Sequence, residues 1–363
     1  MDFSLSDEQA MLRDSVTRYL ADHPFDPKRK RDDVAMWRDF AVRLGILGAA
    51  LPESAGGFGG GAVETMIVME ALGEALVTAP YLETVVIAGG LLKRLPGERA
   101  ASLLAKIVNG EATVALAAFE AGGRHALEAV TTTAAADGNG WVLNGTKAVI
   151  VGAPAADHLL ITARTADGLS LFLADRDATG LTRHDYRLID DRPAADVTLH
   201  NVRAVLLGDD GGALPLLEQV RDEAIAALCA EAAGVMKRML ADTVAYTKER
   251  KQFGQPLSSF QALQHRMVDM FMAVEQATSA AYLATLNLNV DATTRTRAIA
   301  AAKATVSDGI RFVGQNAVQL HGAMGMTDEL AVGHYFKRAT VIEQQFGAAD
   351  HHIKRYVALA QAS

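Results

Sequence analysis

A glycine run, several histidines and a single cysteine are the residues whose types could support chemistry. The run GGFGGG at Gly56–Gly61 resembles the backbone loops that bind phosphate groups. No predicted strand precedes it, and no lysine of a phosphate-binding loop follows it. The run therefore favours a plain loop, and the chain contains no G-x-S-x-G nucleophile motif.

His334, His351 and His352 lack the spacing of a metal-binding motif, since neither HExxH nor CxxC occurs. Adjacent histidines also point in different directions on a helix, so surface histidines are the better interpretation. Cys229 occupies the apolar face of a predicted helix, where a buried and inert thiol is expected. Spacing alone therefore identifies no catalytic site.

Helical patterns occupy the N-terminal part of the chain and return after Gly211-Gly212. Ser6 and Gln9 form a capping-box pattern, which predicts a helix that starts at Asp7. Further helices are predicted at Val63–Leu76, Glu98–Val108, Gln261–Val290, Arg295–Leu320 and from Leu330 onwards. One long helix after Gly212 has an apolar face made of Leu217, Ile225, Leu228, Ala232, Met236 and Met239.

Between Val114 and Leu206 the pattern changes to short apolar runs separated by turn residues. Asp137-Gly138 and Asn144-Gly145 are hairpin signals within this region. Several short strands at this spacing predict a small barrel or sandwich. The fold class is therefore a multidomain α+β protein, with a helical domain at 1–113, a β-domain at 114–206 and a helical bundle at 207–363.

The composition is that of an acidic, aliphatic chain. Of 363 residues, 50% are hydrophobic and 6% aromatic, and the formal net charge is −8. Without a basic patch, the chain lacks the electrostatic footprint of a nucleic-acid-binding protein. Its apolar runs are far shorter than the roughly 20 residues that span a bilayer, and its acidic start is unlike a signal peptide. With Cys229 as the single cysteine, these features predict a cytoplasmic protein without nucleic-acid or membrane partners.

Local strings along essentially the whole chain resemble those of the acyl-CoA dehydrogenases. They are LSDEQ, LPESAGGFGG, LNGTKAVI, YTKERKQFGQPLSSFQALQHRMVDM and QNAVQLHGAMGMTDE. The string ERKQFG, with Gln261 following, is highly specific. The resemblance implies an N-terminal helical domain, a middle β-domain and a C-terminal four-helix bundle, with FAD bound across a subunit interface.

The resemblance also implies which residues reach a flavin that is held mainly by a neighbouring subunit. These are Arg250, Gln252, Phe253, Gln261, Gln319 and Gly322. Arg250 would meet the pyrophosphate, because a guanidinium can donate two parallel hydrogen bonds to phosphate oxygens. Residues supplied to a neighbour imply an oligomer, either a homotetramer or a heterotetramer with a homologous subunit.

The implied reaction is α,β-desaturation of an acyl-CoA, with an acceptor like the electron-transfer flavoprotein. A carboxylate removes the α-proton, and the β-hydrogen leaves as hydride to the flavin. The usual base is the Glu of a Tyr-Glu-Gly string. Aligning Lys337-Arg338-Ala339 and Gly347 with the family pattern places Phe346 at that position. Phenylalanine cannot accept a proton, although its backbone NH can still donate to the thioester oxygen.

Other carboxylates could replace the missing base. Some relatives carry the base on the first long helix of the C-terminal bundle, where Ala224 stands here, flanked by Asp222 and Glu223. Glu223 is therefore the candidate catalytic residue, although it lies roughly 160° from the apolar stripe of its helix. Glu343, just upstream of Phe346, is a weaker candidate.

A second departure concerns the segments that face the isoalloxazine ring in many relatives. Where those carry Thr-Glu-Pro-x-x-Gly-Ser, this chain reads FEAGGRH at Phe119–His125. Where they carry Trp-Ile-Thr, it has Val149-Ile150-Val151. Polar groups for the flavin ring are thus mostly replaced, whereas groups that reach a neighbour's flavin are retained.

This asymmetry favours the base-lacking subunit of a heteromeric acyl-CoA dehydrogenase, paired with a homologous chain that holds the base and the flavin ring. Such pairs in the family act on bulky or dicarboxylic acyl-CoAs, including thioesters of steroid catabolism. Two alternatives stay open. One is a self-sufficient FAD enzyme that uses Glu223, and the other is a non-enzymatic acyl-CoA- or partner-binding protein that has lost flavin.

Overall fold

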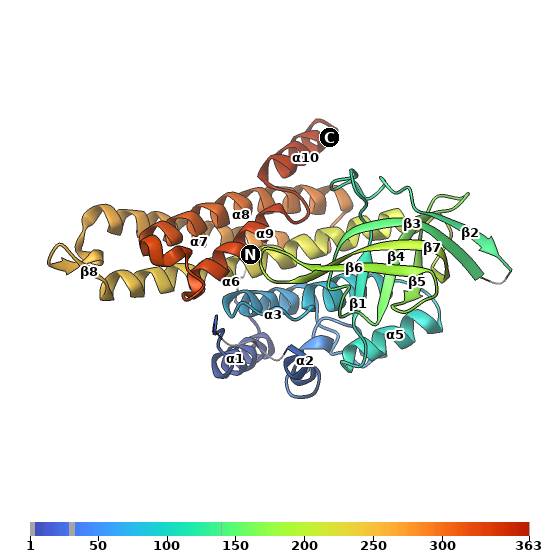
Figure 1. Cartoon of the computed structure of the whole chain (residues 1–363), viewed down its shortest axis with the longest axis horizontal. Helices are drawn as coiled ribbons and strands as arrows, with labels where there is room; N and C mark the ends of the chain where they lie inside the picture. Colours follow the sequence, from blue (N-terminus) through green and yellow to red (C-terminus); the bar gives the residue numbers. More distant parts are fainter. Residues whose placement is uncertain (1–3, 29–32, 139, 363) are drawn as a thin grey trace. The chain divides into compact units, whose positions relative to one another are not determined.

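The computed structural model describes residues 4–28, 33–138 and 140–362 (Figure 1). By its internal contacts the chain divides into two compact units. The first comprises Met1–Asp32, Ala62–Val77 and Ile225–Ser363, and the second comprises Asp33–Gly61 and Thr78–Ala224. The domain limits expected after residues 113 and 206 stay predictions.

The first unit is helical. Its helices are α1 (Asp7–Asp22), α3 (Ala62–Glu74), most of α6 (Ala213–Glu249), α7 (Gln261–Leu286), α8 (Ala292–His321), α9 (Ala331–Gln344) and α10 (Ala349–Ala362). α7 lies beside α8, and α8 also contacts α9 and α10 (Figure 1). The order of N-terminal helices, β-domain and C-terminal helices confirms the predicted fold class.

Local hydrogen bonds explain where the helices begin and end. The Ser6 hydroxyl accepts from the Gln9 NH at 3.2 Å, and the Ser6 NH donates to the Gln9 side chain at 3.1 Å. This reciprocal pair fixes the predicted start at Asp7. α7 was expected to reach Val290 but ends at Leu286. There the Asn287 side chain donates to the Leu283 carbonyl at 2.8 Å, which satisfies a carbonyl that the next turn would otherwise use.

Glycines allow α3 and α6 to pack closely. A Cβ at Gly73 would lie 2.2 Å from the Glu231 carbonyl oxygen, and one at Gly234 would lie 2.0 Å from that of Glu70. Only glycine permits such an approach. The predicted apolar face of α6 is fully buried. Arg338 of α9 is buried against the same helix, where it donates two hydrogen bonds of 2.7 Å to the Glu231 carboxylate.

The second unit holds the remaining helices of the N-terminal part and the β-domain. The helices are α2 (Asp33–Val42), η1 (Ile46–Gly48), η2 (Glu53–Ala55), the π-helix η3 (Tyr81–Ala88), α4 (Gly89–Leu92) and α5 (Glu98–Val108). The glycine run folds as a loop, and a Cβ at Gly57 would lie 2.3 Å from the Leu51 carbonyl oxygen. Close backbone packing therefore accounts for Gly57 without a phosphate ligand.

The β-domain is a seven-stranded sheet in the order β1-β4-β2-β3-β7-β5, with β6 on β7. Its strands are β1 (Val114–Ala117), β2 (Thr133–Asp137), β3 (Gly140–Val151), β4 (His158–Arg164), β5 (Leu169–Asp175), β6 (Leu181–Arg187) and β7 (Pro193–Leu207). An additional pairing of β4 with β5 closes the sheet into a barrel. The barrel interior is filled by aliphatic side chains together with Phe172.

One of the two predicted hairpins is wrong. The Asp137-Gly138 signal does join β2 to β3, with Asp137 opposite Gly140. Asn144-Gly145 instead lies inside β3, at a register shift against β7. A Cβ at Gly145 would come within 2.6 Å of the Thr132 hydroxyl, so glycine is needed there for close approach rather than for a turn.

Two short strands, β8 (Lys251–Gln252) and β9 (Gln255–Pro256), form a hairpin after α6. The short helix η4 (Leu257–Ser259) then leads into α7, and η5 (Gly322–Met326) follows α8. Within the described part of the chain, no helix has both the length and the apolar character to cross a membrane.

Candidate functional site

The hairpin after α6 presents side chains to solvent. The Arg250 NH donates to the Tyr246 carbonyl at 2.8 Å, and the Leu257 NH donates to the Arg250 carbonyl at 2.8 Å, so the base of the hairpin is fixed. At its tip, Phe253 has a left-handed φ of 55° and is 90% exposed. A large aromatic held out in a disfavoured conformation is typical of a binding element.

The polar residues that the sequence assigns to the cofactor lie at the hairpin and in helices α7 and α8. Arg250, Gln252, Gln261 and Gln319 are all exposed. Among the residues that the structure describes, none pairs with the Arg250 guanidinium or the Gln319 amide, whereas the Gln252 amide donates to the Lys251 carbonyl at 2.9 Å. Gln252 and Phe253 follow Arg250 in the same hairpin, and an unpaired guanidinium near an amide and an exposed aromatic ring fits the pyrophosphate and adenosine of a dinucleotide.

The two predicted cofactor segments lie close together. Tyr246 precedes the hairpin by one helical turn, and its hydroxyl donates to the His321 carbonyl at 3.3 Å. The two rings are stacked, with centroids 4.3 Å apart. Gly322, which follows directly, has a φ of 61° where α8 ends and η5 begins. Tyr246 and His321 were not singled out from the sequence, although both stand inside the strings that carried the resemblance.

The segments expected to face the flavin ring are held together by a buried ion pair in the β-domain. The Glu120 carboxylate accepts from Lys147 Nζ at 2.8 Å and from the NH and hydroxyl groups of Thr131 and Thr132. The Ala148 NH donates to the Phe119 carbonyl at 3.0 Å, so the two segments are adjacent. Sequence reasoning missed this pair.

The pKa values of this pair reflect burial and mutual hydrogen bonding. Burial alone would raise the pKa of Glu120, but the hydrogen bonds from Lys147, Thr131 and Thr132 outweigh it and hold the value at about 2. Burial lowers the pKa of Lys147 to about 8, although its hydrogen bond with Glu120 opposes that shift. Both groups are committed to each other, so the pair is structural rather than available to a ligand.

Val149, which the resemblance aligns with the family's tryptophan, lies on a bulge of β3. It has a φ of 53° and is 54% exposed. Its NH donates to Asp196 Oδ1 at 2.8 Å, and the Tyr186 hydroxyl donates to the same oxygen at 2.9 Å. The bulge thus keeps an unusual backbone shape and an outward side chain, but that side chain carries no hydrogen-bonding group.

Phe346 lies in the loop between α9 and α10 with a left-handed φ of 59°. His352 Nε2 is 3.0 Å from the Phe346 carbonyl oxygen. The buried Lys303 donates to the carbonyls of Ile342 and Glu343 at 2.9 and 3.0 Å, which caps the end of α9. The loop is therefore well supported, while its side chain at the expected base position is an aromatic ring.

The other two candidate carboxylates are already paired. Both Glu223 oxygens accept from Arg94, with Nη1 to Oε2 at 3.1 Å, and the pair is largely buried in the second unit. Glu343 lies 3.4 Å from Arg311 Nη1. A general base needs a free lone pair aimed at the substrate, so these contacts favour structural roles. The catalytic role of Glu223 stays a prediction.

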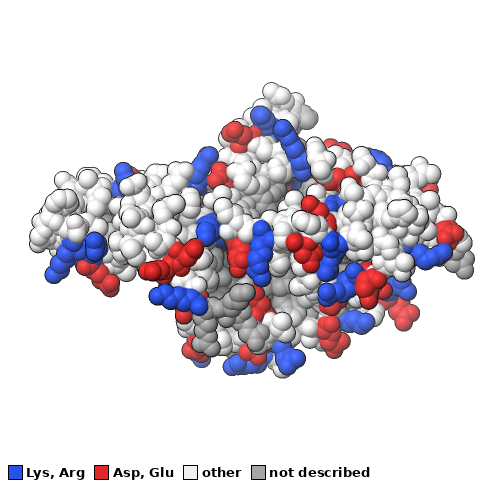
Figure 2. All heavy atoms as spheres, in the orientation of Figure 1, with Lys and Arg blue, Asp and Glu red and all other residues white. Residues whose placement is uncertain are grey.

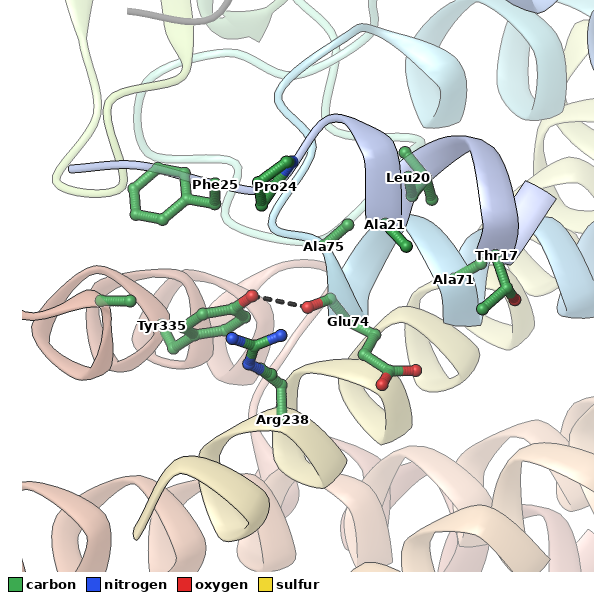
Figure 3. Close-up of a pocket in the computed structure, with 11 residues that line it drawn as sticks. Thr17, Leu20, Ala21, Pro24, Phe25, Ala71, Glu74, Ala75, Arg238 and Tyr335 are labelled. Atoms are coloured by element: carbon green, nitrogen blue, oxygen red, sulfur yellow. Dashed lines mark hydrogen bonds between the residues drawn. The ribbon is translucent and has the colours of Figure 1, made fainter. Parts of the chain in front are cut away.

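The first unit also contains a pocket of about 270 Å³ beside α1, α3, α6 and α9 (Figure 3). Its apolar wall includes Leu20 and Phe25, and the Tyr335 hydroxyl closes one side by donating to the Glu74 carbonyl at 2.5 Å. None of the residues predicted from the sequence to bind FAD lines this pocket. It therefore lies apart from the candidate cofactor contacts.

Cys229 is fully buried, and burial raises the pKa of its thiol to about 12, as expected for an inert cysteine. Within residues 4–28, 33–138 and 140–362, no group of three or more histidine, cysteine, aspartate or glutamate residues could hold a metal ion.

Three family models match the chain in order. The model of the N-terminal domain of acyl-CoA dehydrogenases matches residues 6–111, that of the middle domain matches 115–202, and that of the C-terminal domain matches 219–357. Acyl-CoA dehydrogenase IpdE2 of Mycolicibacterium smegmatis is 30% identical over 364 residues, which span 97% of this chain and 98% of that protein.

Solved structures give the same likeness. A variant of the Tcur3481-Tcur3483 steroid ACAD is 31% identical, with a TM-score of 0.89 over 99% of both chains. A chain of the ChsE4-ChsE5 complex from Mycobacterium tuberculosis is 26% identical, with a TM-score of 0.89 over 100% of both chains.

Proposed function

Because the chain belongs to the acyl-CoA dehydrogenases, a family of FAD-dependent oxidoreductases, we propose that it is the base-lacking subunit of a heteromeric member. Its partner would be a homologous chain that carries the catalytic Glu and holds the flavin ring. In this arrangement Arg250, Gln252 and Phe253 bind the pyrophosphate and adenosine of the partner's FAD, together with Gln261, Gln319 and Gly322.

One observation carries the proposal: side chains with free hydrogen-bonding groups stand at the positions aligned with the family's contacts to a neighbour's FAD, whereas apolar side chains stand at the positions aligned with the base and the ring contacts. The unpaired, exposed Arg250 and Gln319 fit the phosphate and adenosine half of FAD. At the bulge that would meet the ring, Val149 offers only methyl groups. A subunit that completes its neighbour's site needs the first set and not the second.

The chemistry of the reaction supports the same assignment of the base to the partner subunit. FAD supplies the hydride acceptor, and a carboxylate must remove the α-proton of the thioester. A positioned base contributes typically about 10² to 10⁴ in rate. Phe346 cannot act as one, and the paired Glu223 and Glu343 are poorly placed to replace it.

An exposed apolar stripe on α7 provides a surface for the homologous subunit. Val268, Phe271 and Met272 follow helical spacing and are 55%, 52% and 51% exposed. On the face shown in Figure 2, most side chains over α7 and the adjoining end of α6 are uncharged. Exposed apolar residues grouped on one helix face are typical of subunit contacts.

The test is copurification with a homologous chain that contains the base. We expect the complex to contain FAD and to oxidise an acyl-CoA thioester, while this chain alone has neither property. A homotetramer of this chain that binds flavin and turns over substrate would refute the proposal. A complex that stays colourless would instead favour a binding protein that has lost flavin.

The substrate class is proposed from the structural relatives. The Tcur3481-Tcur3483 protein is a steroid ACAD, and we propose that this chain's complex likewise acts on a bulky acyl-CoA, with an electron-transfer flavoprotein-like acceptor. Activity on steroid side-chain thioesters but not on short linear ones is the expected result. A tetrameric assembly and a cytoplasmic location stay predictions.

A further inference from the structure

Arg250 and Gln319 belong to separate segments that end different helices. Arg250 follows α6, and its NH is bonded to the Tyr246 carbonyl at 2.8 Å. Gln319 belongs to the last turn of α8, directly before His321 and Gly322. To bind one ligand, two such segments must keep a fixed distance, since binding geometry tolerates displacements of only about 0.5 Å.

Tyr246 and His321 connect these two segments. Their rings stack at 4.3 Å with an interplanar angle of 27°, and the Tyr246 hydroxyl donates to the His321 carbonyl at 3.3 Å. His321 is buried, and its Nδ1 lies 2.8 Å from the Ala317 carbonyl oxygen. A carbonyl only accepts, so Nδ1 carries the proton and the imidazole orientation is fixed.

The hairpin itself has no other polar link to this part of α8. Among the described residues, no hydrogen bond joins residues 250–256 directly to residues 319–326. The Tyr246–His321 contact therefore fixes the position of one segment relative to the other. On the α8 side, η5 packs closely against the helix, since a Cβ at Gly325 would lie 2.7 Å from the Val318 carbonyl oxygen.

We propose that Tyr246 and His321 are positioning residues, whose contact holds Arg250 and Gln319 in the register needed to bind a single FAD of the neighbouring subunit. This inference rests on the proposed function, and it adds residues that need not touch the cofactor. We therefore expect Tyr246 to affect FAD affinity only by fixing the positions of the two segments that it connects.

The first experiment measures FAD affinity in the complex with the base-containing homologue. Tyr246→Phe keeps the stacking but removes the hydroxyl, and we expect about 3-fold weaker FAD binding. Tyr246→Leu removes both contacts, and about 30-fold weaker binding is expected. Tyr356→Phe is the matched control. It removes the hydroxyl of Tyr356 on α10, which accepts from the Arg297 guanidinium at 3.1 Å, and it should leave FAD affinity unchanged.

A double variant separates positioning from general destabilisation. Gln319→Ala removes the contact that the α8 segment makes with FAD. If Tyr246 acts by holding the two segments in register, adding Tyr246→Phe to Gln319→Ala should then cause little further loss of FAD affinity. An equal effect in both backgrounds would overturn the inference. So would unchanged FAD affinity in Tyr246→Phe and Tyr246→Leu when Arg250→Ala weakens binding, an outcome that leaves the proposed function in place.

If Arg250→Ala also leaves FAD affinity unchanged, the proposed function fails. The contact between Tyr246 and His321 can then be tested in the isolated chain, without cofactor. Hydrogen exchange of residues 250–257 should be faster in Tyr246→Phe than in the wild type or Tyr356→Phe. Unchanged exchange would overturn the positioning role independently of any cofactor.

Discussion

At the hairpin after α6 the Arg250 guanidinium reaches solvent with donors to spare, whereas in the β-domain the Glu120 carboxylate and the Lys147 ammonium are buried and bonded to each other. Arg250 is exposed and unpaired among the described residues. Glu120 is buried and accepts five hydrogen bonds. A buried pair maintains the shape of its own domain, while an exposed unpaired group is available to a ligand.

The backbone at Val149 and Phe346, two positions that the resemblance aligns with the family's site, is also unusual. The bulge at Val149 and the loop at Phe346 retain left-handed backbone conformations, with φ values of 53° and 59°. Such conformations are disfavoured for bulky residues and persist only where the surroundings enforce them. The surroundings of Val149 and Phe346 therefore enforce an unusual backbone shape, although neither side chain carries a hydrogen-bonding group.

The largest expected effect tests the structural side of this comparison. Glu120→Gln leaves the buried Lys147 without its counter-charge, and we expect the free energy of unfolding to fall by about 3–5 kcal/mol. Urea unfolding followed by circular dichroism measures it. Arg250→Ala, at an exposed and unpaired site, should change stability by less than about 0.5 kcal/mol. Similar losses in both variants would break the comparison.

A second prediction concerns the base. Phe346→Glu places a carboxylate on a loop whose backbone is already supported. Because the proposed function assigns both the base and the flavin ring to the partner, we expect flavin reduction by acyl-CoA to change by less than about 2-fold. Stopped-flow absorbance of the flavin in the loaded complex measures the rate. Phe346→Gln is the control, since it is polar but cannot take the proton. A gain of about 10-fold or more over Phe346→Gln, in a complex that binds flavin and substrate, would show that position 346 faces a flavin ring and would contradict the proposed division of the site.

Much of the fold follows from local sequence signals. The capping box at Ser6 and the apolar face of α6 each depend on a few residues of fixed spacing, and both are present as predicted. Asn144-Gly145 does not form the predicted turn. Glycine is needed there because a Cβ would clash with Thr132, and a rule based on local sequence does not include that distant residue. Long-range packing decided that position.

The candidate site was predictable only in part, for a similar reason. Arg250 and Gln319 stand in recognisable strings, so the resemblance could assign them. The contact between Tyr246 and His321 joins residues far apart in the chain, as does the pair of Glu120 with Lys147. Neither has a spacing rule, because the barrel and the helix packing bring the partners together.

A third prediction sharpens the binding side of the comparison. Arg250→Ala should weaken FAD binding by the complex about 10-fold, because a hydrogen-bonded guanidinium–phosphate contact is lost. Lys251→Ala is the matched control, since it removes the same charge from the neighbouring residue. Flavin fluorescence titration distinguishes the two variants. Equal losses would mean that general positive potential, and not the guanidinium geometry, attracts the cofactor.

The smallest expected effect is at Glu223. Both oxygens of its carboxylate accept hydrogen bonds from Arg94, so Glu223, like Glu120, is paired with a basic side chain. Glu223→Gln keeps the shape and a hydrogen bond to Arg94, so flavin reduction by substrate should change by less than about 2-fold if the side chain is not the base. Arg94→Met is the companion variant, because it frees the carboxylate. Loss of flavin reduction in Glu223→Gln, with faster reduction in Arg94→Met, would instead make Glu223 the displaced base and the chain self-sufficient.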